Sequence, residues 1–211
     1  ENKANVEVSD GHGDTALITA IENNFHMTVK SLLGKKANIE AADENGMTPL
    51  SRACEMRYFD IDMVDSLLFK KANIEATDSR GWTPLLCACS TKYPSKVVKC
   101  LLENKANVEV SDGHGDTALI TAIENNFHMT VKSLLGKKAN IEAADENGMT
   151  PLSRACEMRY FDIDMVDSLL FKKANIEATD SRGWTPLLCA CSTKYPSKVV
   201  KCLLENKANV E

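Results

Sequence analysis

The strongest constraint on this chain is internal repetition. Residues 103–204 repeat residues 1–102 without a change, and residues 205–211 begin the same series again. A shorter period lies within each 102-residue block, because Gly13, Gly46, Gly81 and Gly115 are 33, 35 and 34 residues apart and are followed by similar residues. Repeats of this length predict similar structural units, each of which buries apolar side chains only against its neighbours.

Each of these glycines precedes residues that predict the start of a helix. The clearest version is residues 81–88, in which Thr83 can accept a backbone N–H as the N-cap and Pro84 takes the first helical position. Residues 46–53 follow the same pattern, and residues 13–20 follow it with Ala in place of Pro. We therefore expect a first helix after each glycine.

A second helix is expected to follow in each repeat. It ends in Leu-Leu, and the sequence Ala-Asn-Ile/Val-Glu comes shortly afterwards, as in residues 32–40. The predicted helix pairs of one block are about 15–22 and 26–33, 49–56 and 60–69, and 84–90 and 94–102, with Asp60 as a cap.

These features together resemble the ankyrin-repeat family across essentially the whole chain. The resemblance implies an all-α solenoid of about six helix–turn–helix repeats joined by short β-hairpin loops. We expect a single array over residues 1–211, with a partial repeat at 1–12 and repeats that start near Gly13, Gly46, Gly81, Gly115, Gly148 and Gly183.

The chain departs from the family pattern at two positions. The family usually has His after Thr-Pro-Leu, which ties neighbouring loops, whereas this chain has Ile18, Ser51 and Leu86, so we expect apolar packing in place of that tie. The family also usually ends its second helix with Gly. The chain has Lys there, which predicts positive φ at Lys36, Lys71, Lys105, Lys138, Lys173 and Lys207.

Charge and cysteine content narrow the class of protein. The net charge of −5 arises from 25 basic and 30 acidic residues that are interspersed, which favours neither nucleic acid nor a membrane as partner. No apolar run is long enough to span a membrane, and we expect a soluble, cytoplasmic protein. The eight cysteines fall in predicted helices, which favours free buried thiols over disulfides or metal ligands: Cys54, Cys87, Cys89, Cys100, Cys156, Cys189, Cys191 and Cys202.

We expect no enzyme activity, cofactor or metal. Asp10, His12 and Asp14 alternate in a loop and resemble a metal or acid–base cluster, but alternation at a hairpin tip points side chains in different directions, so a solvated tip is favoured. Neither a phosphate-binding glycine loop nor a nucleophile paired with His is found in the sequence.

The resemblance implies a protein-interaction scaffold that binds a protein partner on its concave face, through hairpin tips and first helices. The residues expected to contact the partner are Glu44, Met47, Met56, Arg80, Trp82, Met149, Arg182 and Trp184. For Trp82 the alternative is packing between neighbouring hairpins. The alternative function is a structural spacer, or an elastic or filament-forming segment of a longer array.

We also expect head-to-tail self-association. The helices after Gly13 carry the same apolar residues as those after Gly115, and the helices after Gly183 match those after Gly81. Two complementary apolar ends favour a heterologous contact that propagates from one molecule to the next.

Overall fold

The computed structural model describes residues 5–56, 61–92, 94–158, 163–194 and 196–209. The chain divides into two compact units, residues 1–112 and 113–211, and each is described by itself. The described residues contain six helix pairs, which confirms the predicted helix–turn–helix repeats. Asp60, the expected cap, lies outside the described residues.

The helices begin and end close to the predicted positions. Those of the first unit are α1 (Ala16–Glu22), α2 (His26–Gly34), α3 (Pro49–Glu55), α4 (Ile61–Phe69), α5 (Pro84–Ser90) and α6 (Ser95–Glu103). Those of the second unit are α7 (Ala118–Glu124), α8 (His128–Gly136), α9 (Pro151–Glu157), α10 (Ile163–Phe171), α11 (Pro186–Cys191) and α12 (Ser197–Glu205).

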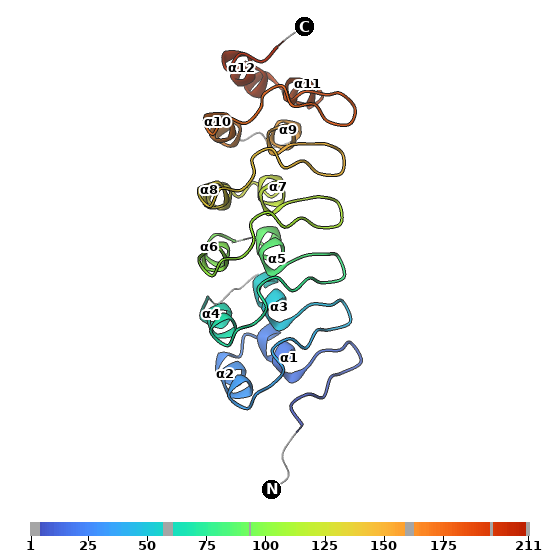
Figure 1. Cartoon of the computed structure of the whole chain (residues 1–211), viewed down its shortest axis with the longest axis vertical. Coiled ribbons are helices and arrows are strands. Elements are labelled where there is room, and N and C mark those ends of the chain that lie inside the picture. Colours follow the sequence, from blue (N-terminus) through green and yellow to red (C-terminus); the bar gives the residue numbers. More distant parts are fainter. Residues whose placement is uncertain (1–4, 57–60, 93, 159–162, 195, 210–211) are drawn as a thin grey trace. The chain divides into compact units, whose positions relative to one another are not determined.

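Each unit is built from two rows of helices and one row of loops. In the first unit, the first helices of the repeats (α1, α3, α5) pack on one another, and each packs on the second helix that follows it (α2, α4, α6). Loops project from the side of the first helices that is opposite to the second helices (Figure 1). The core therefore lies between the two rows, where Leu50, Leu67, Leu85 and Leu101 are fully buried.

The helix starts are set by the threonines that the sequence predicts. Thr48 has an extended backbone, and its side chain accepts a hydrogen bond from the backbone N–H of Ser51 at 3.2 Å. Thr15 and Thr83 cap α1 and α5 in the same way. Because each cap satisfies a backbone donor that the helix leaves unpaired, the short first helices begin at a defined residue.

The second helices end in a left-handed residue. Lys36, Lys71 and Lys105 have φ of 63°, 66° and 69°, and their copies lie between 66° and 69°, so the predicted positive φ is confirmed. The Lys71 N–H donates to Leu68 O at 2.9 Å and the Ala72 N–H donates to Leu67 O at 3.0 Å. This is the Schellman arrangement, which explains why the Leu-Leu pair precedes each lysine at a fixed distance.

The loops between repeats are hairpin-like. In the second loop, the Asp43 N–H donates to Met47 O at 3.1 Å and the Gly46 N–H donates to Asp43 O at 3.0 Å. The described residues contain no β-sheet, and an isolated bridge joins Ser9 and Thr15 in the first loop. Gly46 has φ of 75°, and a Cβ atom there would lie 3.1 Å from the backbone nitrogen of Ser79 in the next loop, so glycine is required for both conformation and space.

Neighbouring repeats are tied by glutamates rather than by the histidine usual in the family. Oε1 of Glu40 accepts the backbone N–H of Asn73 at 2.7 Å, and Oε1 of Glu75 accepts that of Asn107 at 2.7 Å. In the second unit, Glu142 and Glu177 bind Asn175 and Asn209 in the same way. The Ala-Asn-Ile/Val-Glu motif thus carries a tie that we did not predict.

Apolar packing also takes the place of the missing histidine, as predicted. Ile18, Ser51 and Leu86 are at most 1 % exposed. The Ser51 hydroxyl has a hydrogen-bond partner within the same helix start, since its Oγ lies 3.2 Å from Oγ1 of Thr48. The family's histidine position is therefore buried in all three repeats of the first unit.

Replacing Lys71 with Gly should stabilise the chain. Gly adopts positive φ without steric cost, so we expect Lys71→Gly to raise the free energy of unfolding by up to about 1 kcal/mol, less the entropy that Gly adds to the unfolded chain. Urea unfolding followed by circular dichroism measures this. Lys70, whose φ is not positive, is the matched control, and Lys70→Gly should be neutral or destabilising. A destabilised Lys71→Gly variant would contradict the prediction.

Candidate functional site: the hairpin face

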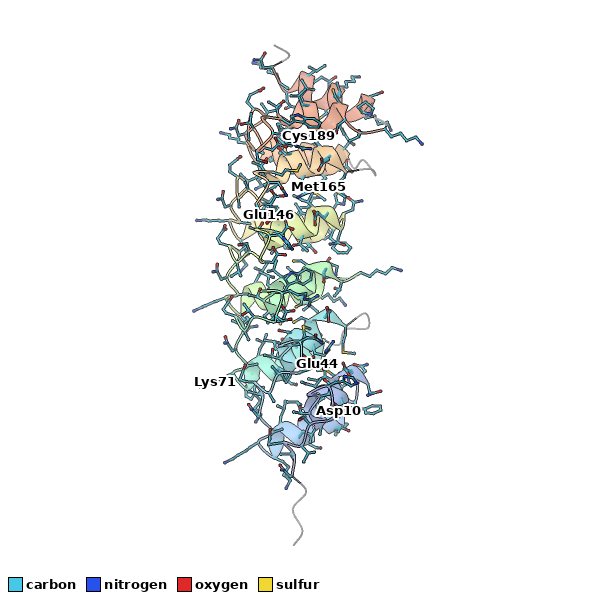
Figure 2. The ribbon with its side chains drawn as sticks, turned by 90° about the vertical axis from the view of Figure 1, so that its right-hand side faces the viewer. Asp10, Glu44, Lys71, Glu146, Met165 and Cys189 are labelled. Carbon is cyan, nitrogen blue, oxygen red and sulfur yellow. The ribbon has the colours of Figure 1, made fainter. Side chains whose placement is uncertain are left out.

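The candidate site consists of the side chains of the loops and first helices, which we call the hairpin face. In the first unit it comprises residues 8–15, 41–48 and 76–83 together with α1, α3 and α5. Figure 2 is viewed from the side on which the loops project in Figure 1, and it labels Asp10 and Glu44 of the first two loops.

An aspartate organises each loop, and it is exposed in the first loop (Asp10) but buried in the second and third (Asp43 and Asp78). Oδ1 of Asp43 accepts the backbone N–H groups of Asn45 and Met47 at 2.8 and 2.9 Å, and Asp43 is only 7 % exposed. Asp78 does the same for Arg80 and Trp82 at 2.9 and 2.8 Å. A carboxylate that accepts two backbone donors fixes the conformation of the turn.

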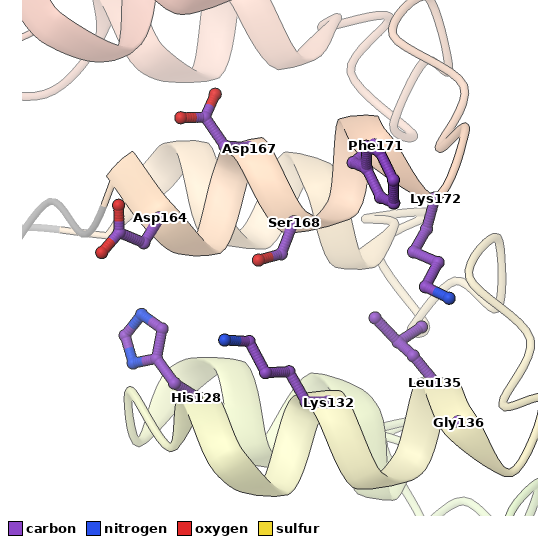
Figure 3. Close-up of a pocket in the computed structure, with 9 residues that line it drawn as sticks. All are labelled: His128, Lys132, Leu135, Gly136, Asp164, Asp167, Ser168, Phe171 and Lys172. Carbon is purple, nitrogen blue, oxygen red and sulfur yellow. The ribbon is translucent and has the colours of Figure 1, made fainter.

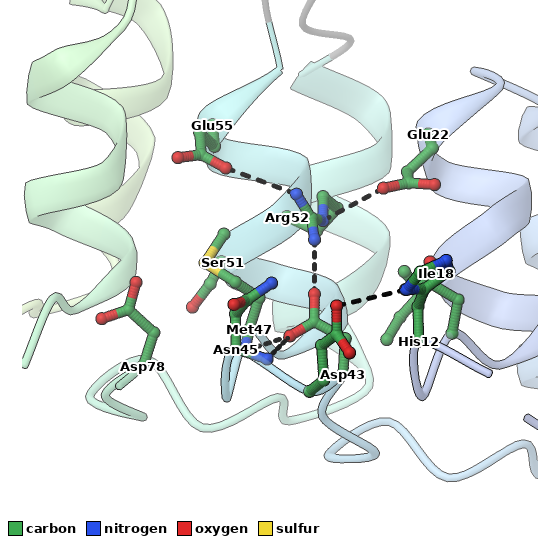
Figure 4. A network of polar contacts seen from close by, with 12 residues as sticks. His12, Ile18, Glu22, Asp43, Asn45, Met47, Ser51, Arg52, Glu55 and Asp78 are labelled. Atoms are coloured by element: carbon green, nitrogen blue, oxygen red, sulfur yellow. Dashed lines mark hydrogen bonds and ion pairs between the residues drawn. The ribbon is translucent and has the colours of Figure 1, made fainter. Parts of the chain in front are cut away.

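Arg52 neutralises the Asp43 carboxylate and links two repeats. Its guanidinium bonds to Oδ2 of Asp43, and it lies 3.3 Å from Glu22 of α1 and 3.5 Å from Glu55 of α3 (Figure 4). The Arg52 side chain is 22 % exposed, so this network is largely shielded from solvent. Arg154 makes the equivalent contacts to Asp145, Glu124 and Glu157 in the second unit.

Arg80 and Trp82 form a partly exposed pair on this face. Nε of Arg80 donates to Oδ2 of Asp78 at 2.8 Å, and its Nη2 lies 3.3 Å from Glu55. The guanidinium carbon sits 4.3 Å from the centre of the Trp82 ring, and Nε1 of Trp82 donates to Asp112 at 3.0 Å. The Arg80 side chain is nonetheless 46 % exposed, so a fixed arginine–tryptophan pair faces solvent.

The second unit contains the same pair. The Arg182 guanidinium lies 4.2 Å from the centre of the Trp184 ring, donates to Asp180 and is 46 % exposed. The two units thus present one arrangement of side chains twice.

The other predicted contact residues differ in accessibility. Glu44 is 56 % exposed and lies 3.2 Å from Nδ1 of His12, and Met56 is half-buried. Met47 and Met149 are only 2 % and 3 % exposed, because they pack inward at the base of the loop. They offer no accessible surface to a partner, which corrects their place among the expected contact residues.

The cluster of Asp10, His12 and Asp14 has a structural explanation. Oδ1 of Asp10 accepts the backbone N–H groups of His12 and Asp14 at 2.8 and 3.0 Å, and these bonds lower the pKa of Asp10. The hydrogen bond to Glu44 raises the pKa of His12. Within the described ranges, no group of three His, Cys, Asp or Glu side chains has an arrangement suited to a metal ion.

The cysteines are free, and seven of the eight are buried. Burial raises the pKa of Cys87 to about 12 and that of Cys100 to about 12, so these thiols stay protonated at neutral pH. Cys191 is the exposed member of the set. No helix in the described part of the chain is long and apolar enough to cross a membrane.

Comparison with known proteins places these observations in a wider context. The family model for ankyrin repeats (3 copies) matches residues 2–78, 59–145 and 126–211. No sequence among curated proteins matches the chain significantly.

Two solved structures resemble the chain over most of its length. The crystal structure of the ankyrin repeat domain of Bcl-3, a unique member of the IkappaB protein family, has a TM-score of 0.83 and 26 % identity, and the match covers 95 % of this chain and 86 % of that one. A chain from the complex of the Bd0816 predatory endopeptidase of Bdellovibrio bacteriovorus with immunity protein Bd3460 has a TM-score of 0.80 and 32 % identity, with 92 % and 100 % covered.

Removing Arg52 should destabilise the first unit. Arg52→Met leaves the buried Asp43 carboxylate without its cation, and we expect the free energy of unfolding to fall by about 2–3 kcal/mol. Lys99→Met, which removes an exposed pair with Glu103 at 3.8 Å, is the control and should change it by about 0.5 kcal/mol or less. Equal effects of the two substitutions in urea unfolding would show that the Arg52 network contributes no more than a surface ion pair.

The cysteines should differ sharply in reactivity. Under native conditions a thiol reagent should modify Cys191 rapidly and the seven buried cysteines only after the chain opens. Mass spectrometry over time measures the number of modified thiols, and Cys191→Ser should remove the rapid phase. Rapid modification of all eight thiols would contradict the buried positions.

Proposed function

Because the chain belongs to the ankyrin-repeat family, we propose that it is a protein-interaction scaffold that binds a protein partner on its hairpin face, and that this face is the concave face of a single array over residues 1–211. The ankyrin-repeat fold is generally a non-catalytic interaction module. The free buried cysteines support a reducing, cytoplasmic location.

The observation that carries the proposal is the accessible pair formed by Arg80 and Trp82. Asp78 and Glu55 hold the guanidinium in place above the indole, so little conformational entropy remains to be lost when a partner binds. Arg and Trp are the residue types most enriched among those that dominate interface energies. Glu44 and Met56 lie on the same face and extend the proposed contact surface, as do Arg182 and Trp184 in the second unit.

The presence of the pair in both units supports binding of a partner that carries two copies of its own site. Linked sites convert the second binding event into an intramolecular one, which raises the overall affinity without a new kind of contact. We propose a protein as the partner in preference to nucleic acid or a membrane, because the hairpin face carries more carboxylates than cations.

Site-directed photo-crosslinking identifies the partner and tests the face. A crosslinking amino acid at position 44 should capture a protein in cells, whereas one at position 103 should not. These positions are matched, because the Glu44 and Glu103 side chains are 56 % and 58 % exposed and lie on opposite sides of the repeats.

The captured protein then allows a quantitative test. With Trp82→Ala and Trp184→Ala combined, we expect its Kd to rise about tenfold or more. With Glu103→Arg and Glu205→Arg combined, we expect a change of about twofold or less, as is usual away from an interface. An unchanged Kd in the tryptophan variant would exclude these residues from the site.

The alternative, a spacer or filament-forming segment, is favoured by one observation. Leu188 and Leu204 are 49 % and 44 % exposed, whereas Leu86 and Leu102, which have the same sequence surroundings, are at most 6 % exposed. This apolar surface in the second unit would support head-to-tail self-association of the 211-residue chain. Sedimentation velocity over a range of concentrations tests it, and Leu188→Lys with Leu204→Lys should leave a monomer.

A further inference from the structure

A groove lies on the opposite side of each unit from the hairpin face, between neighbouring second helices. In the second unit the groove runs between α8 and α10 and encloses about 760 Å³ (Figure 3). In the first unit the corresponding groove between α2 and α4 encloses about 470 Å³. The hairpin-face proposal uses none of the residues that line either groove.

The groove depends on a glycine that the other repeats lack. Gly34 follows the Leu-Leu pair of its repeat, and the equivalent residues of the next two repeats are Phe69 and Glu103. A Cβ atom at Gly34 or Gly136 would meet nothing within 4 Å, and neither has positive φ. The backbone therefore does not require glycine here, and its effect is to leave space above the helix.

An exposed aromatic side chain borders this space. Phe69 and Phe171 are each 84 % exposed, although they are large apolar side chains. Phe171 lies at one end of the groove beside Leu135 and Gly136 (Figure 3). This end of the groove is therefore apolar and open.

Two lysines and two aspartates line the same groove. Lys172 follows Phe171 at the apolar end, whereas Lys132 extends from α8 into the groove toward the other end, where Asp164 lies beside His128 (Figure 3). Neither lysine forms an ion pair with any residue that the structure describes, and the same holds for Lys30 and Lys70 in the first unit. Asp167 also lines the groove, and its carboxylate accepts a hydrogen bond from Sγ of Cys202 at 2.8 Å.

We propose that each groove is a second docking surface, which takes an acidic peptide segment of a partner protein with an aliphatic or aromatic side chain as its anchor. The anchor packs between Phe171 and Gly136 above Leu135, and carboxylates beside it contact Lys132 and Lys172. Lys172 beside the anchor and Lys132 in the middle of the groove favour an acidic segment at the end away from Asp164, and the concave shape favours a peptide over the flat surface of a membrane.

Selection from a random peptide library on phage, with the full chain as target, tests the proposal. Peptides that bind the wild-type chain and fail to bind the Phe69→Ser/Phe171→Ser variant should be rich in Asp and Glu and contain an apolar residue. Because both phenylalanines are exposed, the variant should fold, which circular dichroism checks. If no peptide depends on the phenylalanines, or if the dependent ones are basic, the proposal fails.

Fluorescence anisotropy with a selected peptide then separates the contribution of the groove lysines from general attraction between opposite charges. We expect two peptides bound per chain and about tenfold weaker binding to Lys30→Glu/Lys132→Glu. The matched control is Lys99→Glu/Lys201→Glu, since these lysines are also exposed on second helices but lie outside the groove, and it should change the Kd by about twofold or less. Equal losses in the two variants would indicate general attraction between opposite charges and overturn the proposal.

Two further variants test the shape of the groove and its independence from the hairpin face. Gly34→Phe/Gly136→Phe fills the space and should abolish peptide binding, whereas Trp82→Ala/Trp184→Ala should leave it unchanged. Vesicles of phosphatidylserine and phosphatidylcholine provide the last comparison. Phenylalanine-dependent binding to these vesicles, without selected peptides, would assign the surface to a membrane and overturn the peptide proposal.

Discussion

The hydrogen bonds of the buried carboxylates Asp43 and Asp78 are the interaction on which the rest of the hairpin face depends. Asp43 and Asp78 are 7 % exposed, and each accepts two backbone N–H groups, so the loop has one conformation. Their negative charge then requires a cation nearby, which Arg52 and Arg80 supply. The position of the accessible guanidinium of Arg80 is therefore a consequence of how the loop folds.

Features set within one repeat could be predicted from the sequence. Thr48 and the proline after it define a helix start through contacts within one turn, and the Leu-Leu pair with Lys71 defines a helix end in the same way. The tie from Glu40 to Asn73 could not be predicted, because it joins residues 33 apart and depends on the register between two repeats. Apolar periodicity carries no information about that register.

The exposure of the candidate contact residues could not be predicted from the sequence either. Met47 and Trp82 occupy the same position, directly before the capping threonine, and both were expected to face a partner. Met47 is 2 % exposed and its sulfur lies 3.5 Å from Nη2 of Arg80 in the next loop, whereas Trp82 is half-exposed. The repeat alignment gives the position of each side chain along the chain but not its contacts with the next repeat, which help to determine its accessibility.

The three unlike repeats of a block differ most where the fold imposes no requirement. The loop aspartate, the capping threonine and the left-handed lysine recur in all three, whereas the position after Leu-Leu is Gly34, Phe69 or Glu103. The grooves with an exposed phenylalanine at one end lie where the glycine of one repeat is followed by the phenylalanine of the next. The proposed peptide recognition is consequently a property of the 102-residue block rather than of a single repeat, since no single repeat supplies both walls of the groove.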